Sequence, residues 1–419
     1  MPTDAQSWQP SKVDATSDRP ETSAKAFSWL AEPRIILALI GLYVLGHFVL
    51  RLALSPTLGI DDAEQMLFAQ HWAFGYRFRQ PPLFTWLLLP VIEVFGPSIV
   101  AISLVRYALL AITFVFLYLT ARLCLHDQRM AGLAALSLTL IYVFAYYAHH
   151  DLTHTTALGA MIVLLLYVTA RLAKNPTWSA YAAAGLVIGL GMLAKWNFAM
   201  LAIGLPLTCL ALPAYRHLVL TPKIAFTIAI AATVVAPTAL WMLSHDQSVQ
   251  ALSSDILTKD GAAAAGTSWL AGAGALSRSI LLFPLPFLPI FLTIFGRSLL
   301  ARQHVPTTDF RPALTPAFFA CLMLVVLGLH AFLIPLFGAV SFTERWLHPA
   351  LMALPIYLFA LAERGSPTTR QVTVFLASIA ILVAVATTAR LYRYMEGVDD
   401  CGRCREFAPF AEFAEGLRA

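Results

Sequence analysis

Three carboxylates within four residues open a polar segment between two hydrophobic stretches: Asp61, Asp62 and Glu64. An ionised side chain is costly in hydrocarbon, so we expect them at the water boundary or in a solvated cavity of a helix bundle. A carboxylate placed there can act as a general base, hold a divalent cation or pair with a basic side chain. The alternative is a solvated loop whose acids favour the first turn of a short helix.

Three basic residues lie where a cation needs an anionic partner. Lys195 separates two short apolar stretches, and Arg345 occupies a comparable boundary. A lipid phosphate suits both. The ammonium of Lys195 needs an anion near the membrane, and the guanidinium fork of Arg345 matches phosphate or carboxylate geometry. Lys195 has the alternative of snorkelling to the headgroup region. Arg106 lies inside an apolar stretch, and we expect it to pair with an acid between Asp61 and Glu64.

A second polar cluster comprises His150, Asp151 and His154. It has three interpretations: a second carboxylate for the same site, a set of metal ligands, or a helix start that Asp151 caps. A divalent cation is therefore a candidate cofactor, with Asp62, Glu64 and Asp151 as its candidate ligands.

The composition indicates a polytopic membrane protein. Hydrophobic residues make up 59% of the chain, charged residues 12%, and the mean hydropathy is +0.73. Repeated apolar stretches of about 17 to 25 residues predict an all-α bundle of about eleven transmembrane helices. The net charge of +5 comes from basic residues scattered through loops, which argues against a nucleic-acid partner.

The apolar stretches predict spans at residues 35–54, 99–123, 131–147, 155–167, 180–194, 198–212, 224–243, 280–295, 316–334, 347–362 and 372–388. Residues 63–72 are expected to form a short interfacial helix in the first external loop, and 244–277 a long polar segment. Pro284, Pro286 and Pro289 are expected to kink the eighth span.

Three regions follow from this topology. Residues 1–33 are expected to be a disordered cytoplasmic tail, 34–390 the transmembrane catalytic domain, and 391–419 a short periplasmic tail. The short loops on the side of the N-terminal tail are all basic, as the positive-inside rule requires of cytoplasmic loops. Cys401 and Cys404 then face an oxidising compartment, where a disulfide is favoured over redox catalysis.

The polar segments resemble the polyprenyl-phosphate-sugar-dependent glycosyltransferases of family 39, in the GT-C fold class. The motifs that carry this resemblance are Asp61-Asp62-Ala63, Gly75-Tyr76, Gln80-Pro81-Pro82-Leu83, Phe95-Gly96, Arg106 and the run Gly189-Leu190-Gly191-Met192-Leu193-Ala194-Lys195. The first loop is most similar to the bacterial galacturonosyltransferases that modify lipopolysaccharide; protein mannosyltransferases and aminoarabinose transferases are further relatives. Family members commonly have Glu at position 62 and Lys or His at position 80.

The resemblance implies a GT-C helical bundle in the bacterial inner membrane, with its active site facing the periplasm. Such an enzyme moves a sugar from a polyprenyl-phosphate donor to lipid A, lipopolysaccharide or another envelope acceptor. We expect Asp61 to be the base of an inverting displacement, with Asp62 and Glu64 orienting it. Lys195, Arg345 and Arg106 are the expected ligands of the donor phosphate. The alternatives are a membrane transporter or lipid flippase, and an inactive scaffold.

Overall fold

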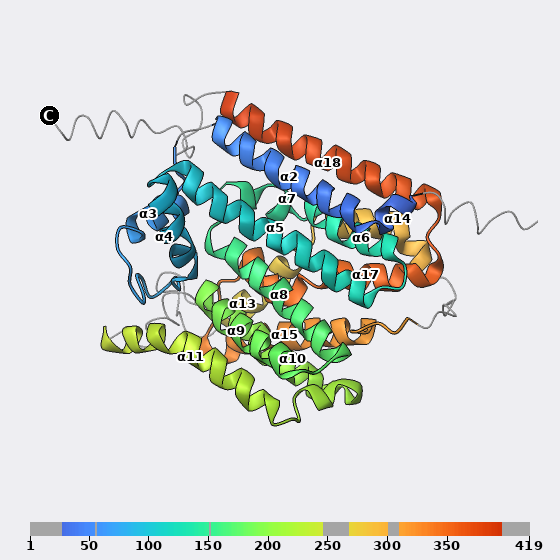
Figure 1. Ribbon diagram of the computed structural model, residues 1–419. Coiled ribbons are helices and arrows are strands. Elements are labelled where there is room, and N and C mark those ends of the chain that lie inside the picture. Colours follow the sequence, from blue (N-terminus) through green and yellow to red (C-terminus); the bar gives the residue numbers. More distant parts are fainter. Residues whose placement is uncertain (1–26, 55–56, 151, 246–267, 301–309, 396–419) are drawn as a thin grey trace, which may run out of the picture.

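A computed structural model describes residues 27–54, 57–150, 152–245, 268–300 and 310–395 (Figure 1). Within these ranges the regular elements are helices and no strand is formed, which confirms the all-α fold. Residues 1–26 of the predicted N-terminal tail, Asp151 and the Cys401/Cys404 pair lie outside the described residues. The end of that predicted tail is ordered, because residues 28–31 form a 3-10 turn with Leu30 fully buried.

In the part of the chain that the structure describes, six helices are long and apolar enough to cross a bilayer. They are α2 (Pro33–Leu54), α5 (Ile99–Cys124), α8 (His154–Lys174), α11 (Lys223–Ser244), α15 (Pro316–Phe337) and α18 (Thr369–Met395). Each has at least 21 residues. At a rise of about 1.5 Å per residue, that length matches the roughly 30 Å hydrocarbon core.

Five shorter apolar helices lie between and beside these: α4 (Leu83–Phe95), α9 (Trp178–Ala194), α10 (Ala199–Ala211), α13 (Ser268–Leu282) and α14 (Phe287–Leu300). The segments 344–351 and 354–365 together have the length of one further span but bend by 50° between them. The described residues thus contain six spans by length and composition, or seven with the bent pair, and the predicted total of eleven is not confirmed.

Short elements connect the spans. They are α3 (Ile60–Phe68), α6 (Gln128–Leu136), α7 (Tyr142–Ala145), α16 (His348–Leu351), α17 (Leu354–Ala362) and the 3-10 turns η1 (Ser28–Ala31), η2 (Ser137–Leu140), η3 (Tyr147–His149), η4 (Trp196–Phe198), η5 (Pro213–Leu218), η7 (Glu344–Leu347) and η8 (Glu363–Gly365). The interfacial helix predicted at 63–72 exists as α3 but begins earlier, at Ile60.

The prediction of one continuous third span, 131–147, is wrong. The chain there divides into α6, η2, α7 and η3. At the first break, the hydroxyls of Ser137 and Thr139 donate to the carbonyls of Ala134 and Leu136 at 2.7 Å. Such local hydrogen bonds offer the backbone an alternative to the regular helix ladder.

The eighth predicted span, 280–295, is also interrupted. Helix α13 ends at Leu282 and α14 begins at Phe287, with Pro284 and Pro286 between them. Proline has no backbone N–H and clashes with the preceding turn, so the two prolines separate the helices. Helix α13 starts at Ser268, which means that the end of the predicted polar segment 244–277 is helical instead.

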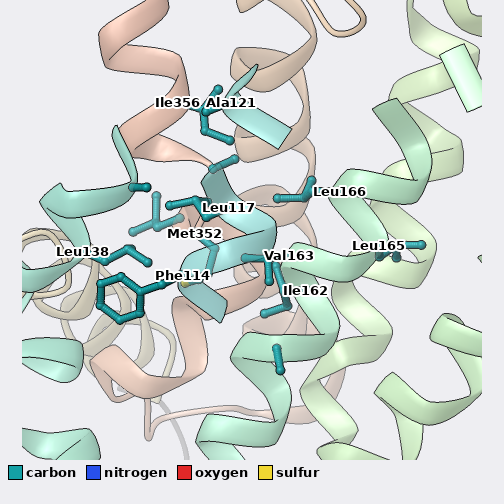
Figure 2. Packing of buried hydrophobic residues seen from close by; sticks show 14 of the residues in the cluster. Phe114, Leu117, Ala121, Leu138, Ile162, Val163, Leu165, Leu166, Met352 and Ile356 are labelled. Atoms are coloured by element: carbon teal, nitrogen blue, oxygen red, sulfur yellow. The ribbon is translucent and has the colours of Figure 1, made fainter. Parts of the chain in front are cut away.

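The core lies where α5 and α8 pack together. Figure 2 shows Val163 and Ile162 of α8 on one side of α5 and the Phe114 ring on its other side, with Leu117 and Met352 between them. All five side chains are at most 2% exposed. This dry contact provides the rigid centre from which the polar loops extend.

Helices α9 and α11 pack closely through two glycines one turn apart. A Cβ atom at Gly185 would lie 2.5 Å from the carbonyl oxygen of Thr227, and one at Gly189 would lie 2.6 Å from Cβ of Val234. Small residues four positions apart allow membrane helices to approach backbone to backbone. This approach fixes the C-terminal end of α9, where Lys195 follows.

Candidate active site

Helix α3 presents two different faces. Asp62 and Gln65 are fully buried, whereas Asp61 and Glu64 are partly exposed. Residues three apart lie on one side of a helix, while neighbours are turned by about 100°. The buried pair therefore anchors α3 to the bundle, and Asp61 is left facing the less crowded side.

Asp62 forms a buried ion pair with Arg106 of α5. Both side chains are fully buried, and Arg51 of α2 lies 4.0 Å from the same carboxylate. Arg51 also donates to the carbonyl of Thr57 at 2.7 Å. The predicted pairing of Arg106 with an acid of the first loop is thus present, and it holds α3 against two spans. The role of Arg106 in donor binding stays a prediction.

Gln65 joins α3 to two more helices. Its amide oxygen accepts a hydrogen bond from Thr85 of α4 at 2.7 Å, and its amide nitrogen lies 3.0 Å from Nε2 of His154 at the start of α8. His154 therefore contacts the first loop, as one member of the predicted second polar cluster. His150 is buried nearby in the chain, and Asp151 lies outside the described residues.

Glu64 forms an ion pair with Arg77 at 2.7 Å, and the Arg77 side chain is 58% exposed. The first turn of α3 contains Asp61 and Asp62, and its N-cap Gly59 makes no side-chain cap. The predicted preference of acids for the helix start is therefore compatible with these positions. Orienting roles for Asp62 and Glu64 remain predictions.

The turn after α9 ties together three segments that are far apart in sequence. Lys195 donates to the hydroxyl of Thr155 on α8 at 3.0 Å. Trp196 donates through its indole N–H to the carbonyl of Phe78 in the first loop at 2.9 Å. Asn197 donates to the carbonyl of Trp346 in η7 at 3.1 Å. The first loop, α8 and η7 consequently meet at this turn.

Lys195 also connects the candidate base with the other cations. Burial lowers the pKa of its ammonium from 10.5 to about 8, and the positive charges of Arg345 and Arg79 contribute, while Asp61 opposes the shift. Lys195 thus interacts electrostatically with both Asp61 and Arg345. It links two side chains that the sequence placed at separate boundaries.

Arg345 lies with its guanidinium 5.5 Å from the centroid of the Tyr147 ring in η3. An arginine on an aromatic face gains a cation–π interaction and keeps its N–H fork available at the edge. This contact positions η7 next to the broken segment between α6 and α8.

The candidate metal ligands do not form a metal site in the described part of the chain. Arginines already pair with Asp62 and Glu64, and Asp151 is not among the described residues. Over the described ranges, no group of three His, Cys, Asp or Glu side chains could hold a metal ion. These two carboxylates therefore do not fit the expected cofactor, whose use remains untested.

A buried polar cluster inside the bundle was missed from the sequence. Arg390 of α18 is fully buried and lies 2.6 Å from Nδ1 of His47 on α2. His47 stacks on His149, with ring centroids 4.0 Å apart, and the hydroxyl of Tyr43 lies 3.0 Å from Nε2 of His149. The contact joins α2 to α18, which lie side by side in Figure 1. The available signal was Arg390 itself, a cation just beyond the predicted last span.

The sequence profile of the dolichyl-phosphate-mannose-protein mannosyltransferase family matches residues 79–241. Two curated relatives from Rhizobium johnstonii are similar over longer stretches. The lipopolysaccharide core galacturonosyltransferase RgtB is 31% identical over 405 residues, which cover 95% of this chain and 78% of RgtB. The lipopolysaccharide core galacturonosyltransferase RgtA is 32% identical over 331 residues, which cover 77% of this chain and 63% of RgtA.

Solved structures of ArnT from Cupriavidus metallidurans share the fold. The apo structure matches with a TM-score of 0.56 and 16% identity, and the structure bound to undecaprenyl phosphate with 0.57 and 18%. Each match covers 83% of this chain and 63% of ArnT, so the chain spans less than two thirds of that protein. With RgtB 31% identical over most of both chains and ArnT alike in fold, this chain belongs to the membrane glycosyltransferases of family 39, in the GT-C class.

Proposed function

We propose that this enzyme transfers a galacturonic acid unit from a polyprenyl-phosphate donor to the lipopolysaccharide core, on the periplasmic side of the inner membrane. Support for the sugar and the acceptor comes from the names of the two Rhizobium relatives. Support for the donor comes from the fold shared with ArnT, which has been solved with undecaprenyl phosphate. Membership in a transferase family favours this function over the alternatives of transport or scaffolding.

The observation that carries the proposal is the turn at residues 195–197. It holds the first loop and η7 against α8, and its Lys195 interacts electrostatically with both Asp61 and Arg345. Sugar transfer from a phosphate needs a base next to positive charge, at a place that a lipid and a polar acceptor can both reach. This turn is where the described residues bring those charges together.

In the proposed reaction, an acceptor hydroxyl oxygen attacks the anomeric carbon of the sugar and forms the new glycosidic bond. The bond from that carbon to the phosphate oxygen breaks, and its electron pair leaves with the polyprenyl phosphate. Asp61 takes the proton of the attacking hydroxyl, while Lys195 and Arg345 stabilise the departing phosphate. A single in-line displacement of this kind inverts the anomeric configuration.

Asp62 acts differently from Asp61 in this proposal. Its carboxylate is fully buried against Arg106, with Arg51 as a second cation. A group held in this way positions α3 and does not reach a substrate. The buried contact of Asp62 with Arg106 thereby orients the neighbouring Asp61.

The test is a transfer assay with purified protein, polyprenyl-phosphate galacturonic acid and extracted lipopolysaccharide core, read by the mass of the acceptor. Asp61→Asn should abolish transfer but leave donor binding and the thermal unfolding profile close to those of the wild type. Glu93→Gln, which neutralises an exposed carboxylate on α4, is the matched control and should retain transfer. A chelator arm tests whether a divalent cation adds to the charge of Lys195 and Arg345. Turnover by Asp61→Asn would refute the assigned base.

A further inference from the structure

Two polar side chains beside Lys195 each use one atom to hold the backbone of η7. Asn197 donates from Nδ2 to the carbonyl of Trp346 at 3.1 Å, and His348 donates from Nδ1 to the carbonyl of Arg345 at 2.8 Å. A carbonyl oxygen can only accept, so these contacts define the amide orientation and the imidazole tautomer. The second atoms, Oδ1 of Asn197 and Nε2 of the neutral His348 ring, are therefore acceptors.

Both of these acceptor atoms are buried and lack a hydrogen-bond partner among the described residues. His348 is fully buried, with its ring edge-on to Phe144 at 5.5 Å and to Phe283 at 5.2 Å between centroids. Buried polar atoms in native proteins almost always have a partner, whether protein, water or ligand. Asn197 and His348 hold consecutive carbonyls of η7, so their two unpaired acceptors mark a place where a water molecule or a ligand hydroxyl would complete the hydrogen bonding.

The surrounding charge specifies the chemistry of that ligand. His348 holds the backbone carbonyl of Arg345, and Asn197 follows Lys195 by two residues in the same turn, so an anionic group bound by the two cations would lie near these acceptors. An acceptor repels the lone pairs of phosphate or carboxylate oxygens, whereas it binds a hydroxyl, which brings its own proton. A glycosyl phosphate offers both features, an anion for the cations and ring hydroxyls for the acceptors.

We propose that Asn197 and His348 recognise the transferred sugar by accepting hydrogen bonds from its ring hydroxyls. This inference rests on the proposed function and assigns the sugar specificity of the site. Asn197 and His348 then bind the part of the donor that changes between sugars, while Lys195 and Arg345 bind the phosphate that all such donors share. Loss of a hydroxyl from the donor leaves one acceptor unpaired, which is the source of strong discrimination in polar sites.

The experiment compares polyprenyl-phosphate galacturonic acid with analogues that each lack one ring hydroxyl. For the wild type, kcat/KM should fall at least about tenfold with the analogue that leaves Nε2 of His348 unpaired. In His348→Asn the amide nitrogen replaces the Nδ1 donor but no acceptor reaches the Nε2 position. The ratio of kcat/KM for the full donor to kcat/KM for the deoxy analogue should therefore approach one. In His348→Gln an amide oxygen reaches the Nε2 position, and the ratio should persist.

Two further variants keep the test decisive. His330→Asn is the matched control, because Nδ1 and Nε2 of His330 face the carbonyls of Val326 and Trp346 and neither is open; it should keep the wild-type ratio. Asn197→Ala should abolish discrimination against a different analogue, and it carries the test if His348→Asn does not fold.

Separate outcomes identify which idea fails. Equal losses of kcat/KM for the full and the deoxy donors in His348→Asn and Asn197→Ala would mean that both residues only support η7, and would overturn this inference alone. If the wild type consumed no polyprenyl-phosphate sugar at all, the proposed function would fall together with it.

Discussion

Replacing Arg106 by Met should strongly destabilise the protein, because it leaves the carboxylate of Asp62 buried. Both side chains are fully buried, and removal of one partner from a buried ion pair typically costs about 3–5 kcal/mol. Arg51 lies 4.0 Å from the same carboxylate and compensates part of the charge. We therefore expect the lower end of that range, a loss of about 3 kcal/mol in the free energy of unfolding.

The assay is equilibrium unfolding in mixed micelles, with transfer activity measured in parallel. The double variant Asp62→Leu/Arg106→Met should recover most of the stability, because a buried pair can be exchanged for apolar side chains at little net cost. Its activity should remain low, since α3 loses the contact that orients Asp61. Glu64→Gln is the control and should cost no more than about 1 kcal/mol, because its ion pair with Arg77 is exposed. A single variant Arg106→Met as stable as this control, or a double variant no better than the single one, would refute the reasoning.

Two further predictions concern the end of α9. If the Lys195 ammonium binds the donor phosphate, kcat/KM should fall as pH rises through about 8, where that group loses its proton. In Lys195→Arg the guanidinium stays charged, so the fall in the pH–rate profile should move to higher pH. A fall at the same pH in the variant would contradict the assignment. Gly185→Val should destabilise the α9–α11 contact by about 1–3 kcal/mol, since its Cβ would lie 2.5 Å from the backbone oxygen of Thr227. The control Gly41→Ala has no atom within 4 Å of its new Cβ and should leave the unfolding free energy close to that of the wild type.

The sequence allowed the long spans to be predicted but not the breaks between them. Hydropathy identifies α5 because 26 nearly uncharged residues have only one helical solution in a bilayer. It could not locate the break within 131–147, because that segment is as apolar as a span. The break there depends on hydroxyls such as those of Ser137 and Thr139, which bind locally only when the tertiary structure permits it.

For the candidate site, the sequence indicated which residues take part but not which role each of them has. Asp61 and Asp62 are chemically identical neighbours, and only the direction from which α5 approaches α3 decides which of them meets Arg106. Asn197 and His348 gave no signal at all, because one polar residue in a turn and one histidine in an apolar stretch are ordinary. Their significance comes from contacts to η7 that span 149 and 3 positions in the chain.

The site is built at helix breaks for a physical reason. In a continuous helix the carbonyls of Phe78 and Trp346 would accept from their own helix, whereas in loop and 3-10 segments they are open to side chains of the turn after α9. A Cβ atom at Gly191 would clash with the ring of Phe198, so a glycine is needed for this turn to fold back on α9. Interrupted helices thus supply the anchors that hold the turn carrying Lys195 against η7 and against the first loop, which also carries Asp61.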